Sequence, residues 1–147
     1  MSTQITAART VSMGHRLPTY AGICRSPHGH NMTITVKVTV KTFTDFKEVD
    51  AELASIVESF DHTMILQDSD PLVAVLVPMG FRVVTLNVEP TTENIATLIF
   101  NELHAKLADR KFTALYSVQV QETAKYGARV NEGNWRIKRV QDFNLGD

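Results

Sequence analysis

Alternation of apolar and polar residues is the first signal in this chain, and it predicts a long β-strand over residues 31–42. The apolar positions of this run are Ile34, Val36, Val38 and Val40. Thr and Lys occupy the positions between them, so one face of the strand is buried and the other is wet or covered by a partner. A first strand is expected over 5–17, followed by a loop over 20–27.

Two later segments carry apolar residues at helical spacing instead. A helix is expected over about 47–60, and a second begins at 90–93, where Pro and Thr precede an acidic first turn. The first apolar stripe is Val49, Leu53, Ile56, Val57 and Phe60; the second is Ile95, Leu98, Ile99, Leu103 and Leu107. Each stripe suits a helix that packs one face against a sheet.

The remaining segments complete one α+β domain over residues 1–147. We expect a polar loop over 61–70, a short helix over 71–77, and strands over 81–88, 115–121 and from 130 to about 140. The order β-β-α-β-α-β, with alternating strands, favours an antiparallel sheet with two helices on one face. The uncovered face then requires a partner, which predicts an oligomer.

Composition narrows the classes of function. The 147 residues are 44% hydrophobic and 21% charged with a net charge of −1, which is typical of a globular domain and gives no attraction to nucleic acid or anionic membrane. No apolar leader or membrane-length run is present, and the single cysteine suits a reducing compartment. We therefore expect a cytoplasmic protein.

Candidate chemistry begins at His28-Gly29-His30, at the head of the alternating run. Residues i and i+2 of a strand point to one face, so both imidazoles can reach one metal ion, with His15 as a third ligand. Three ligands leave a fourth position open, as in catalytic zinc sites. Two alternatives remain: exposed strand histidines, or a structural site closed by Cys24.

Two further clusters are weak by themselves. Asp61-His62 suits an acid/base pair, but it also suits a solvated loop. Glu122 follows an alternating strand, where a surface carboxylate is the ordinary interpretation. His104 lies on the polar part of the second helix and is given no role.

Together these clusters resemble the 6-pyruvoyl-tetrahydropterin synthase / 6-carboxytetrahydropterin synthase family over roughly Val11 to Val130. The resemblance rests on GHRL (14–17), CRSPHGHN (24–31), DFKEVD (45–50), FDHTMIL (60–66), PTTENIA (90–96) and VQVQET (118–123). The histidine-cysteine block and the Asp-His block are its specific parts.

The resemblance implies roles for these residues. His15, His28 and His30 would be zinc ligands; Cys24 would be the catalytic base, with Asp61 and His62 as the second proton-handling pair. Glu122 would accept hydrogen bonds from the pterin edge, with Thr91 and Thr92 as neighbours, although one of these threonines can instead be a helix N-cap. Arg16, Arg25 and Lys125 are candidates to contact a triphosphate.

The resemblance also implies a reaction and an assembly. The substrate would be 7,8-dihydroneopterin triphosphate, and the fold would be the tunnelling fold (T-fold). In that fold, trimers form a barrel and two trimers stack into a hexamer with active sites between subunits. The compact spacing from Cys24 to His28 and His30 favours a lyase that forms 6-carboxytetrahydropterin, acetaldehyde and triphosphate for 7-deazaguanine (queuosine precursor) synthesis. A 6-pyruvoyl product and a non-catalytic zinc- or pterin-binding homologue are the alternatives.

The sequence departs from the family pattern in three places. The lead into the first histidine is Val11-Ser12-Met13-Gly14, and Lys47 stands where a glycine often follows Asp-Phe. The segment 123–147, which contains Trp135, is longer than expected, and it could alter the assembly or the pocket rim.

Overall fold

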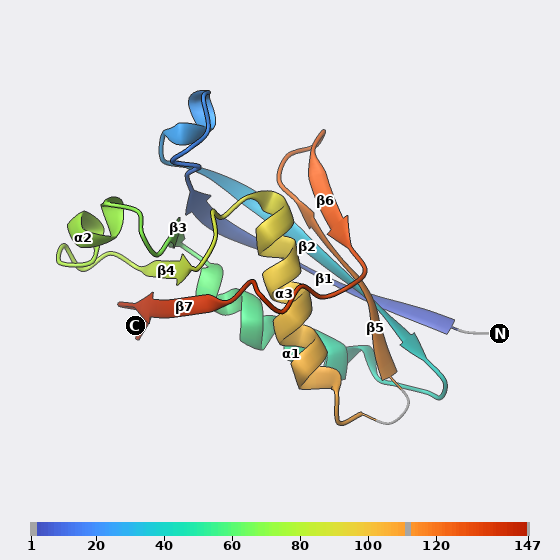
Figure 1. Ribbon diagram of the computed structural model, residues 1–147. Helices are drawn as coiled ribbons and strands as arrows, with labels where there is room; N and C mark the ends of the chain where they lie inside the picture. The colour runs from blue at the N-terminus through green and yellow to red at the C-terminus, as the bar shows by residue number, and fades with distance from the viewer. Residues whose placement is uncertain (1–2, 111–112, 147) are drawn as a thin grey trace.

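The computed structural model describes residues 3–110 and 113–146, so residues 1–2, 111–112 and 147 of the predicted domain lie outside the described part. It contains one seven-stranded sheet in the order β6-β5-β2-β1-β3-β4-β7 (Figure 1). The strands are β1 (Thr3–His15), β2 (His28–Val40), β3 (Thr63–Gln67), β4 (Val83–Leu86), β5 (Thr113–Gln121), β6 (Gly127–Val130) and β7 (Arg139–Phe143). The helices are α1 (Phe46–Val57), α2 (Leu72–Leu76) and α3 (Thr92–Leu107), with 3-10 turns η1 (Ile23–Arg25) and η2 (Glu58–Phe60).

The two predicted N-terminal strands form one long antiparallel ribbon at the centre of the sheet. Thr3 pairs with Val40 and His15 with His28, so β1 and β2 are aligned over their whole length. Both strands lie two or three residues earlier than expected, which brings His28 and His30 inside β2. The alternation of Ile34 through Val40 is confirmed, since these apolar side chains are buried.

The prediction of a fully antiparallel sheet is wrong. Segment 61–70, expected to be a loop, contains β3, which runs parallel to β1, and β4 runs parallel to β3. The five residues of β3 are buried or half-buried with no polar-apolar alternation, because both faces of this strand are covered. The sheet is therefore mixed, and the α+β class is confirmed.

The two long helices pack on one face of the sheet, as predicted (Figure 1). All ten residues of the two predicted stripes are buried, together with inward residues of β1, β2 and β5. Asp45 caps α1 by accepting from the Lys47 backbone N–H, and Thr91 caps α3 by accepting from that of Asn94. No helix within the described residues is both long and apolar enough to cross a membrane.

The C-terminal tail crosses the middle of α3 and extends the sheet past β4 (Figure 1). Only part of the expected last strand forms: β6 ends at Val130, and β7 begins at Arg139. Between them the Asn101 side chain donates to the carbonyls of Asn134 and Ile137, which fixes the crossing segment. Arg139 then donates two hydrogen bonds to Glu102 of α3, so β7 is tied to the helix layer as well as to β4.

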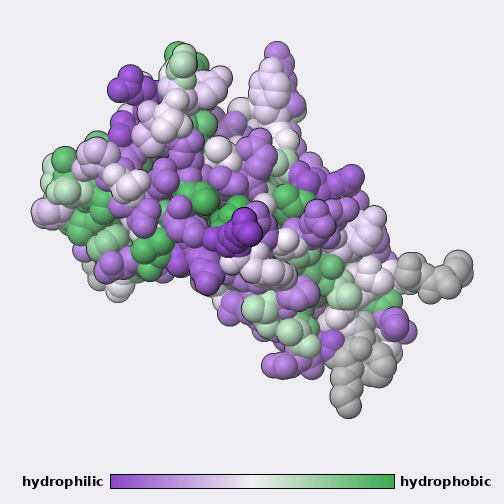
Figure 2. All heavy atoms as spheres, in the orientation of Figure 1, coloured by the Kyte–Doolittle hydropathy of each residue, from purple (hydrophilic) through white to green (hydrophobic). Residues whose placement is uncertain are grey.

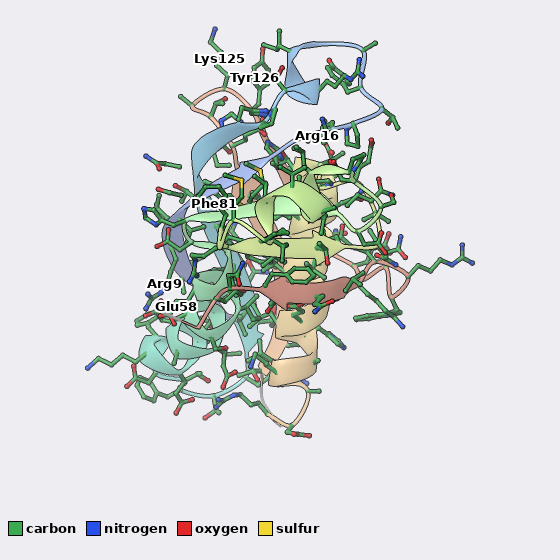
Figure 3. All side chains as sticks on the ribbon, turned by 90° about the vertical axis from the view of Figure 1, so that its left-hand side faces the viewer. Arg9, Arg16, Glu58, Phe81, Lys125 and Tyr126 are labelled. Atoms are coloured by element: carbon green, nitrogen blue, oxygen red, sulfur yellow. The ribbon has the colours of Figure 1, made fainter. Side chains whose placement is uncertain are left out.

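The side of the molecule that carries α2 exposes several hydrophobic side chains (Figure 2). Val75, Met79 and Phe81 are each more than half exposed on α2 and the loop after it. Figure 3 looks onto this side of the molecule and places Phe81 below Arg16. Of these three residues, Phe81 lines a cavity described below.

A buried ion pair fastens the end of β1 to α2. Arg16 donates two hydrogen bonds of 2.7 Å to Asp70, whose side chain is fully buried, and Asp70 also accepts from the Leu72 backbone N–H at the start of α2. Burial alone would raise the pKa of the Asp70 carboxyl, but these donors outweigh it and hold the pKa below its usual range. The pair therefore anchors the residue next to His15.

We expect Asp70→Asn to lower the free energy of unfolding by about 3 kcal/mol at pH 7, because it leaves Arg16 without its partner in a largely buried place. Since the folded pKa of Asp70 is depressed, its contribution is fully present above the unfolded value and is lost as pH falls through the folded value. The difference from wild type should therefore shrink below about pH 4. Urea denaturation at several pH values measures both effects.

Asp68→Asn is the matched control, because Asp68 is exposed two residues earlier and only its backbone N–H is bonded. It should change stability by no more than about 0.5 kcal/mol. Equal stabilities of the Asp68 and Asp70 variants would contradict the anchoring role of the ion pair.

Candidate functional site

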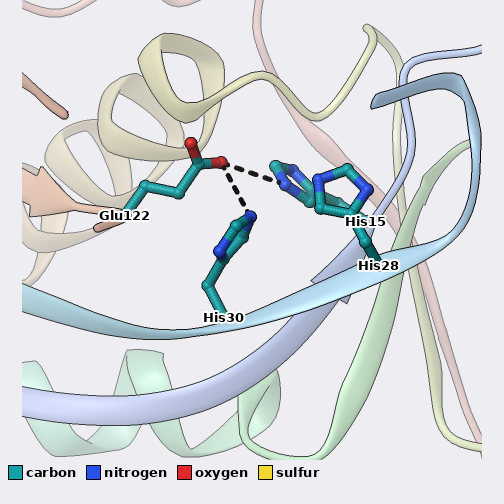
Figure 4. Close-up of side chains that lie close together, drawn as sticks. All are labelled: His15, His28, His30 and Glu122. Atoms are coloured by element: carbon teal, nitrogen blue, oxygen red, sulfur yellow. Dashed lines mark ion pairs between the residues drawn. The ribbon is translucent and has the colours of Figure 1, made fainter. Parts of the chain in front are cut away.

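Three histidines converge at one end of the β1–β2 ribbon (Figure 4). The register pairs His15 directly with His28, and His30 is two residues further along β2 on the same face. The ring centroids lie 4.6 Å apart for His15 and His28, 5.0 Å for His28 and His30, and 5.5 Å for His15 and His30. The predicted three-histidine cluster is thus brought together by strand pairing alone.

Backbone carbonyls orient two of the three rings. His15 Nδ1 lies 2.8 Å from the Pro90 carbonyl oxygen, and His28 Nδ1 lies 2.7 Å from that of Ser26. A carbonyl oxygen can only accept, so each Nδ1 carries the proton and each Nε2 carries a lone pair. Hydrogen bonds of this kind, from the outer ring nitrogen, are what fixes metal-binding histidines in proteins.

Burial favours the neutral form of the innermost histidine. His15 is 2% exposed, and desolvation lowers its pKa despite the opposing hydrogen bond to Pro90; the neighbouring His28 and His30 lower the pKa further, whereas Glu122 opposes them. A neutral imidazole is the form that binds a metal ion.

Glu122, at the end of β5, faces the same cluster. Its Oε1 lies 3.1 Å from His15 Nε2 and 3.4 Å from His30 Nε2, yet among the described residues neither buried nitrogen has a hydrogen-bond partner. A carboxylate oxygen and an unprotonated Nε2 both present lone pairs, so a proton or a cation must lie between them. One ligand atom from each of the three histidines and Glu122 lies within 4.8 Å of the others.

The two predicted threonines have different surroundings. Thr92 Oγ1 donates to Glu122 Oε1 at 3.2 Å, so it contacts the carboxylate that is expected to bind the pterin edge. Thr91 Oγ1 accepts from the Asn94 backbone N–H and caps α3, so Thr91 takes the N-cap role that was the alternative to a contact with the pterin. The N-terminus of α3 thereby lies beside a carboxylate, where its dipole is favourable.

Cys24 lies in η1, in the loop between the two histidine strands, and it is half-buried. Its carbonyl accepts from the Leu17 backbone N–H at 2.9 Å, which closes the loop. Within the described residues the cluster of ligand atoms includes Glu122 and not Cys24. The closed Cys-His₃ arrangement is therefore not formed, and Glu122 is the group that could fill a fourth position.

Asp61 and His62 are clamped to β1 just before β3. Asp61 Oδ1 accepts from the Ser12 backbone N–H at 2.9 Å, and the His62 backbone N–H donates to the Ser12 carbonyl at 2.6 Å. The Ser12 N–H lowers the pKa of the Asp61 carboxyl against the effect of burial, with help from His62 and Arg82. His62 Nδ1 lies 3.1 Å from Asp61 Oδ2, which leaves Nε2 of an exposed ring free to handle protons.

The backbone of His62 has a φ of 54°, in the left-handed region that residues other than glycine seldom adopt. Such a conformation costs about 1–3 kcal/mol and is enriched at functional sites. It supports a functional interpretation of the Asp61-His62 pair over that of an ordinary solvated loop.

The pair lies over the opposite face of the β1–β2 ribbon from the metal ligands. His62 lines a cavity of about 770 Å³ with Ser12, Gly14, Asn31 and Met64. In the two ribbon strands, Ser12, Gly14 and Asn31 alternate with His15 and His30, so their side chains point to the other face. By strand alternation the metal ligands and the Asp61-His62 pair therefore lie on different faces of the ribbon, and among the metal ligands His30 also borders this cavity.

Several residues of this arrangement could not be found from the sequence. The Pro90 and Ser26 carbonyls orient the rings, but every residue has a carbonyl and no motif marks these two. Asn31 belongs to the HGHN block and could have been noticed there, whereas Arg82 lies in a segment without a motif. Arg16, a candidate triphosphate contact, is bound to Asp70, while Arg25 and Lys125 are exposed.

Comparison with known proteins places this geometry in a family. The sequence model of 6-pyruvoyl tetrahydropterin synthase matches residues 4–133. The chain belongs to this family. It is 35% identical over 124 residues to a Halobacterium salinarum protein named "probable 6-carboxy-5,6,7,8-tetrahydropterin synthase", covering 82% of this chain and 81% of the relative. A Rickettsia bellii 6-carboxy-5,6,7,8-tetrahydropterin synthase is 27% identical over 119 residues, covering 75% and 86%.

Solved structures show the same fold. An uncharacterized protein from Wolinella succinogenes superposes with a TM-score of 0.76 at 21% identity, covering 89% of this chain and 98% of that one. The Caenorhabditis elegans 6-pyruvoyl tetrahydropterin synthase superposes with a TM-score of 0.67 at 20% identity, covering 90% and 97%. The predicted T-fold architecture of the single chain is thereby supported.

We expect Glu122→Gln to retain the metal ion and His28→Ala to lose it. Three imidazoles suffice for a zinc site with an open fourth position. Loss of one imidazole should weaken zinc binding by more than about 100-fold, because removing a ligand costs more affinity than removing a residue that only hydrogen-bonds to a ligand. Zinc content by mass spectrometry and affinity by chelator competition measure this.

His104→Ala is the control, because His104 is exposed on α3 and lies against Phe100 and Trp135. It should bind zinc as the wild type does. Loss of zinc from Glu122→Gln, equal to that from His28→Ala, would show that Glu122 is a fourth ligand of a closed site.

Proposed function

We propose that this protein is a zinc-dependent lyase that converts 7,8-dihydroneopterin triphosphate to 6-carboxy-5,6,7,8-tetrahydropterin with release of acetaldehyde and triphosphate, in 7-deazaguanine/queuosine precursor synthesis. The observation that carries the proposal is the convergence of three histidines on Glu122, with the Nε2 atoms of His15 and His30 buried and without partners among the described residues. Membership of the 6-pyruvoyl tetrahydropterin synthase family supplies the substrate class.

The residues present fit zinc. His15, His28 and His30 would hold the ion through nitrogen atoms that two carbonyls already orient, and the lone pairs that face one another call for a cation. When bound, zinc supplies Lewis-acid stabilisation of negative charge on a side-chain oxygen of the substrate. Other divalent transition metals also accept three imidazoles, so the metal requires direct measurement.

Glu122 and Thr92 would recognise the pterin. A carboxylate held beside a hydroxyl donor and a helix N-terminus can accept a pair of hydrogen bonds from the amino-pyrimidinone edge. A ring that lacks those donors would leave the carboxylate unpaired, which gives discrimination. Thr91 contributes by capping α3, which places Thr92 beside Glu122.

Cys24, Asp61 and His62 would move the protons. The Cys24 thiolate would take a proton from carbon of the substrate side chain, since a thiolate near a cation forms readily at neutral pH. Asp61 would hold His62 with Nδ1 protonated, so that Nε2 exchanges a proton with a substrate hydroxyl.

The metal ligands and the Asp61-His62 pair of one chain lie on different faces of the ribbon, so they would not contact the same substrate molecule. The complete site would therefore need a second chain. Cys24 lies in the loop between the metal-binding strands, whereas Asp61-His62 would reach the metal site of a neighbouring copy. A hexamer built as a dimer of trimers, with each barrel closed by strands of neighbouring subunits, would satisfy this requirement.

The names of the curated relatives favour the 6-carboxy product over the 6-pyruvoyl product. Matches at 27–35% identity carry the 6-carboxy name. The likeness to the C. elegans 6-pyruvoyl enzyme is at 20% identity and concerns the fold. Product analysis decides between them.

Incubation of the zinc-loaded protein with 7,8-dihydroneopterin triphosphate should yield 6-carboxytetrahydropterin and acetaldehyde, detected by mass spectrometry. Cys24→Ala should keep its zinc and lose at least about 100-fold in kcat, the usual effect of removing a positioned acid or base. A 6-pyruvoyl product would assign the alternative reaction. Zinc retention without turnover in the wild type would indicate a non-catalytic homologue.

Co-expression of Cys24→Ala with His62→Ala should restore activity that neither variant has alone. If each site takes Cys24 from one chain and His62 from another, random mixing regenerates about a quarter of the sites. Activity per purified mixed oligomer measures the restoration.

Co-expression of Cys24→Ala with His28→Ala is the matched control. Cys24 lies in the loop that leads into β2, and β2 carries His28, so both residues of a site would come from the same chain. No chain in this mixture has both residues intact, and the mixture should stay inactive. Failure of the first pair to regain activity, with an active wild type, would place all of these groups in one chain.

A further inference from the structure

The cavity beside the Asp61-His62 pair is lined by no acidic residue, and the donors that it offers to a ligand are those of Asn31 and Arg82. Its polar lining residues are Ser12, His30, Asn31, His62, Thr63 and Arg82. Its volume of about 770 Å³ lies in the range of small-molecule sites. A site of this composition selects a ligand that accepts hydrogen bonds and carries negative charge.

Local hydrogen bonds orient the Asn31 amide and the His62 ring in this cavity. Ser12 Oγ donates to Asn31 Oδ1 at 2.6 Å, so the oxygen end of the Asn31 amide is occupied and its NH₂ end remains available. The Asp61 carboxylate holds Nδ1 of His62 at 3.1 Å, which leaves Nε2 on the outer side of the ring. Both groups therefore present nitrogen atoms.

Arg82 brings a guanidinium charge to this cavity, and no carboxylate of the described residues neutralises it by direct contact. Its Nη1 donates to the Leu145 carbonyl at 3.1 Å, and among the described residues no carboxylate lies within ion-pair distance of it. Asp61 is near enough to interact with Arg82 through space, but its oxygens are held by Ser12 and His62. The arginines that do form ion pairs are Arg9, Arg16, Arg110 and Arg139.

The hydrophobic residues around these donors strengthen the site. Met64, Leu76 and Phe81 line the same cavity, and Phe81 projects from the side of the molecule that Figure 3 faces. Apolar walls exclude water, so a guanidinium binds an anion more strongly there than on an open surface. The C-terminal tail supports this wall, because the Asn144 side chain donates to the carbonyls of Val77 and Phe81.

We propose that this cavity is an oxyanion subsite that binds the triphosphate arm of the substrate, with Arg82 as its principal contact and Asn31 as a further donor. The identity of the arm rests on the proposed function, but the binding of a polyphosphate does not. His62 would then border both the phosphate chain and the hydroxyls next to it, which places its acid/base role beside the anchored arm.

Inorganic tripolyphosphate is the probe, titrated into the zinc-loaded protein by calorimetry at fixed ionic strength. The wild type should bind it saturably, and Arg82→Gln should weaken binding by about 10- to 100-fold, the effect of one bidentate charge-assisted contact. Arg82→Lys should recover part of the loss, because lysine keeps the charge without the planar fork. Equal zinc content before and after titration excludes extraction of the metal as the source of the difference.

Arg136→Gln is the matched control. Arg136 is exposed in the C-terminal tail, away from the cavity-lining residues, and its substitution removes the same charge. It should leave the tripolyphosphate affinity within about twofold, as expected for a screened surface charge. Absence of saturable binding by the wild type, or equal weakening by the Arg82 and Arg136 substitutions, would overturn the proposal.

Kinetics separates this proposal from the proposed function. With 7,8-dihydroneopterin triphosphate, Arg82→Gln should raise KM more than it lowers kcat, while competition by unphosphorylated 7,8-dihydroneopterin should be unchanged. If the wild type binds tripolyphosphate through Arg82 but does not convert the pterin substrate, the subsite proposal stands and the proposed lyase activity is contradicted. If the wild type converts the pterin substrate and Arg82→Gln leaves KM unchanged, the lyase activity stands and the subsite proposal is contradicted.

Discussion

The antiparallel pairing of β1 with β2 is the constraint on which the rest of the structure depends. Its register sets His15 opposite His28 and Met13 opposite His30, so the metal ligands meet without any contribution from a flexible loop. A slip of one residue would send a whole strand's side chains to the wrong face, exposing Met32 and Ile34 together with the histidines. The same apolar residues that bury the core therefore hold the register of the site.

Much of the fold could be predicted because its signals are local. The alternation in β2 and the stripes of α1 and α3 each repeat over several turns or residue pairs, and their buried positions are as expected. β3 was missed because a strand of five residues covered on both faces has no alternation to detect. Its parallel pairing with β1 arises from long-range contacts, which no local pattern records.

The candidate site also has parts that local sequence patterns predict and parts that depend on long-range contacts. His28 and His30 are related by strand geometry, and a strand partner could supply His15, so the cluster was accessible from sequence. The position of Glu122 against His15 and His30 depends on where β5 ends relative to β2, which sequence spacing does not give. The placement of the Asp61-His62 pair over the other face of the ribbon required the three-dimensional structure, as did the pairing of Arg16 with Asp70.

The C-terminal strand lies beyond the residues that the family model matches, and it has a consequence for colloidal behaviour. Without β7, the outer edge of β4 would expose unpaired backbone groups beside fully buried Val83 and Val84, a template for pairing with other molecules. β7 replaces that edge with a strand of only five residues, and a short edge strand offers little template for further strand addition. The tail thus covers the edge of β4, so any strand-to-strand assembly on this side of the sheet must pair with the short β7.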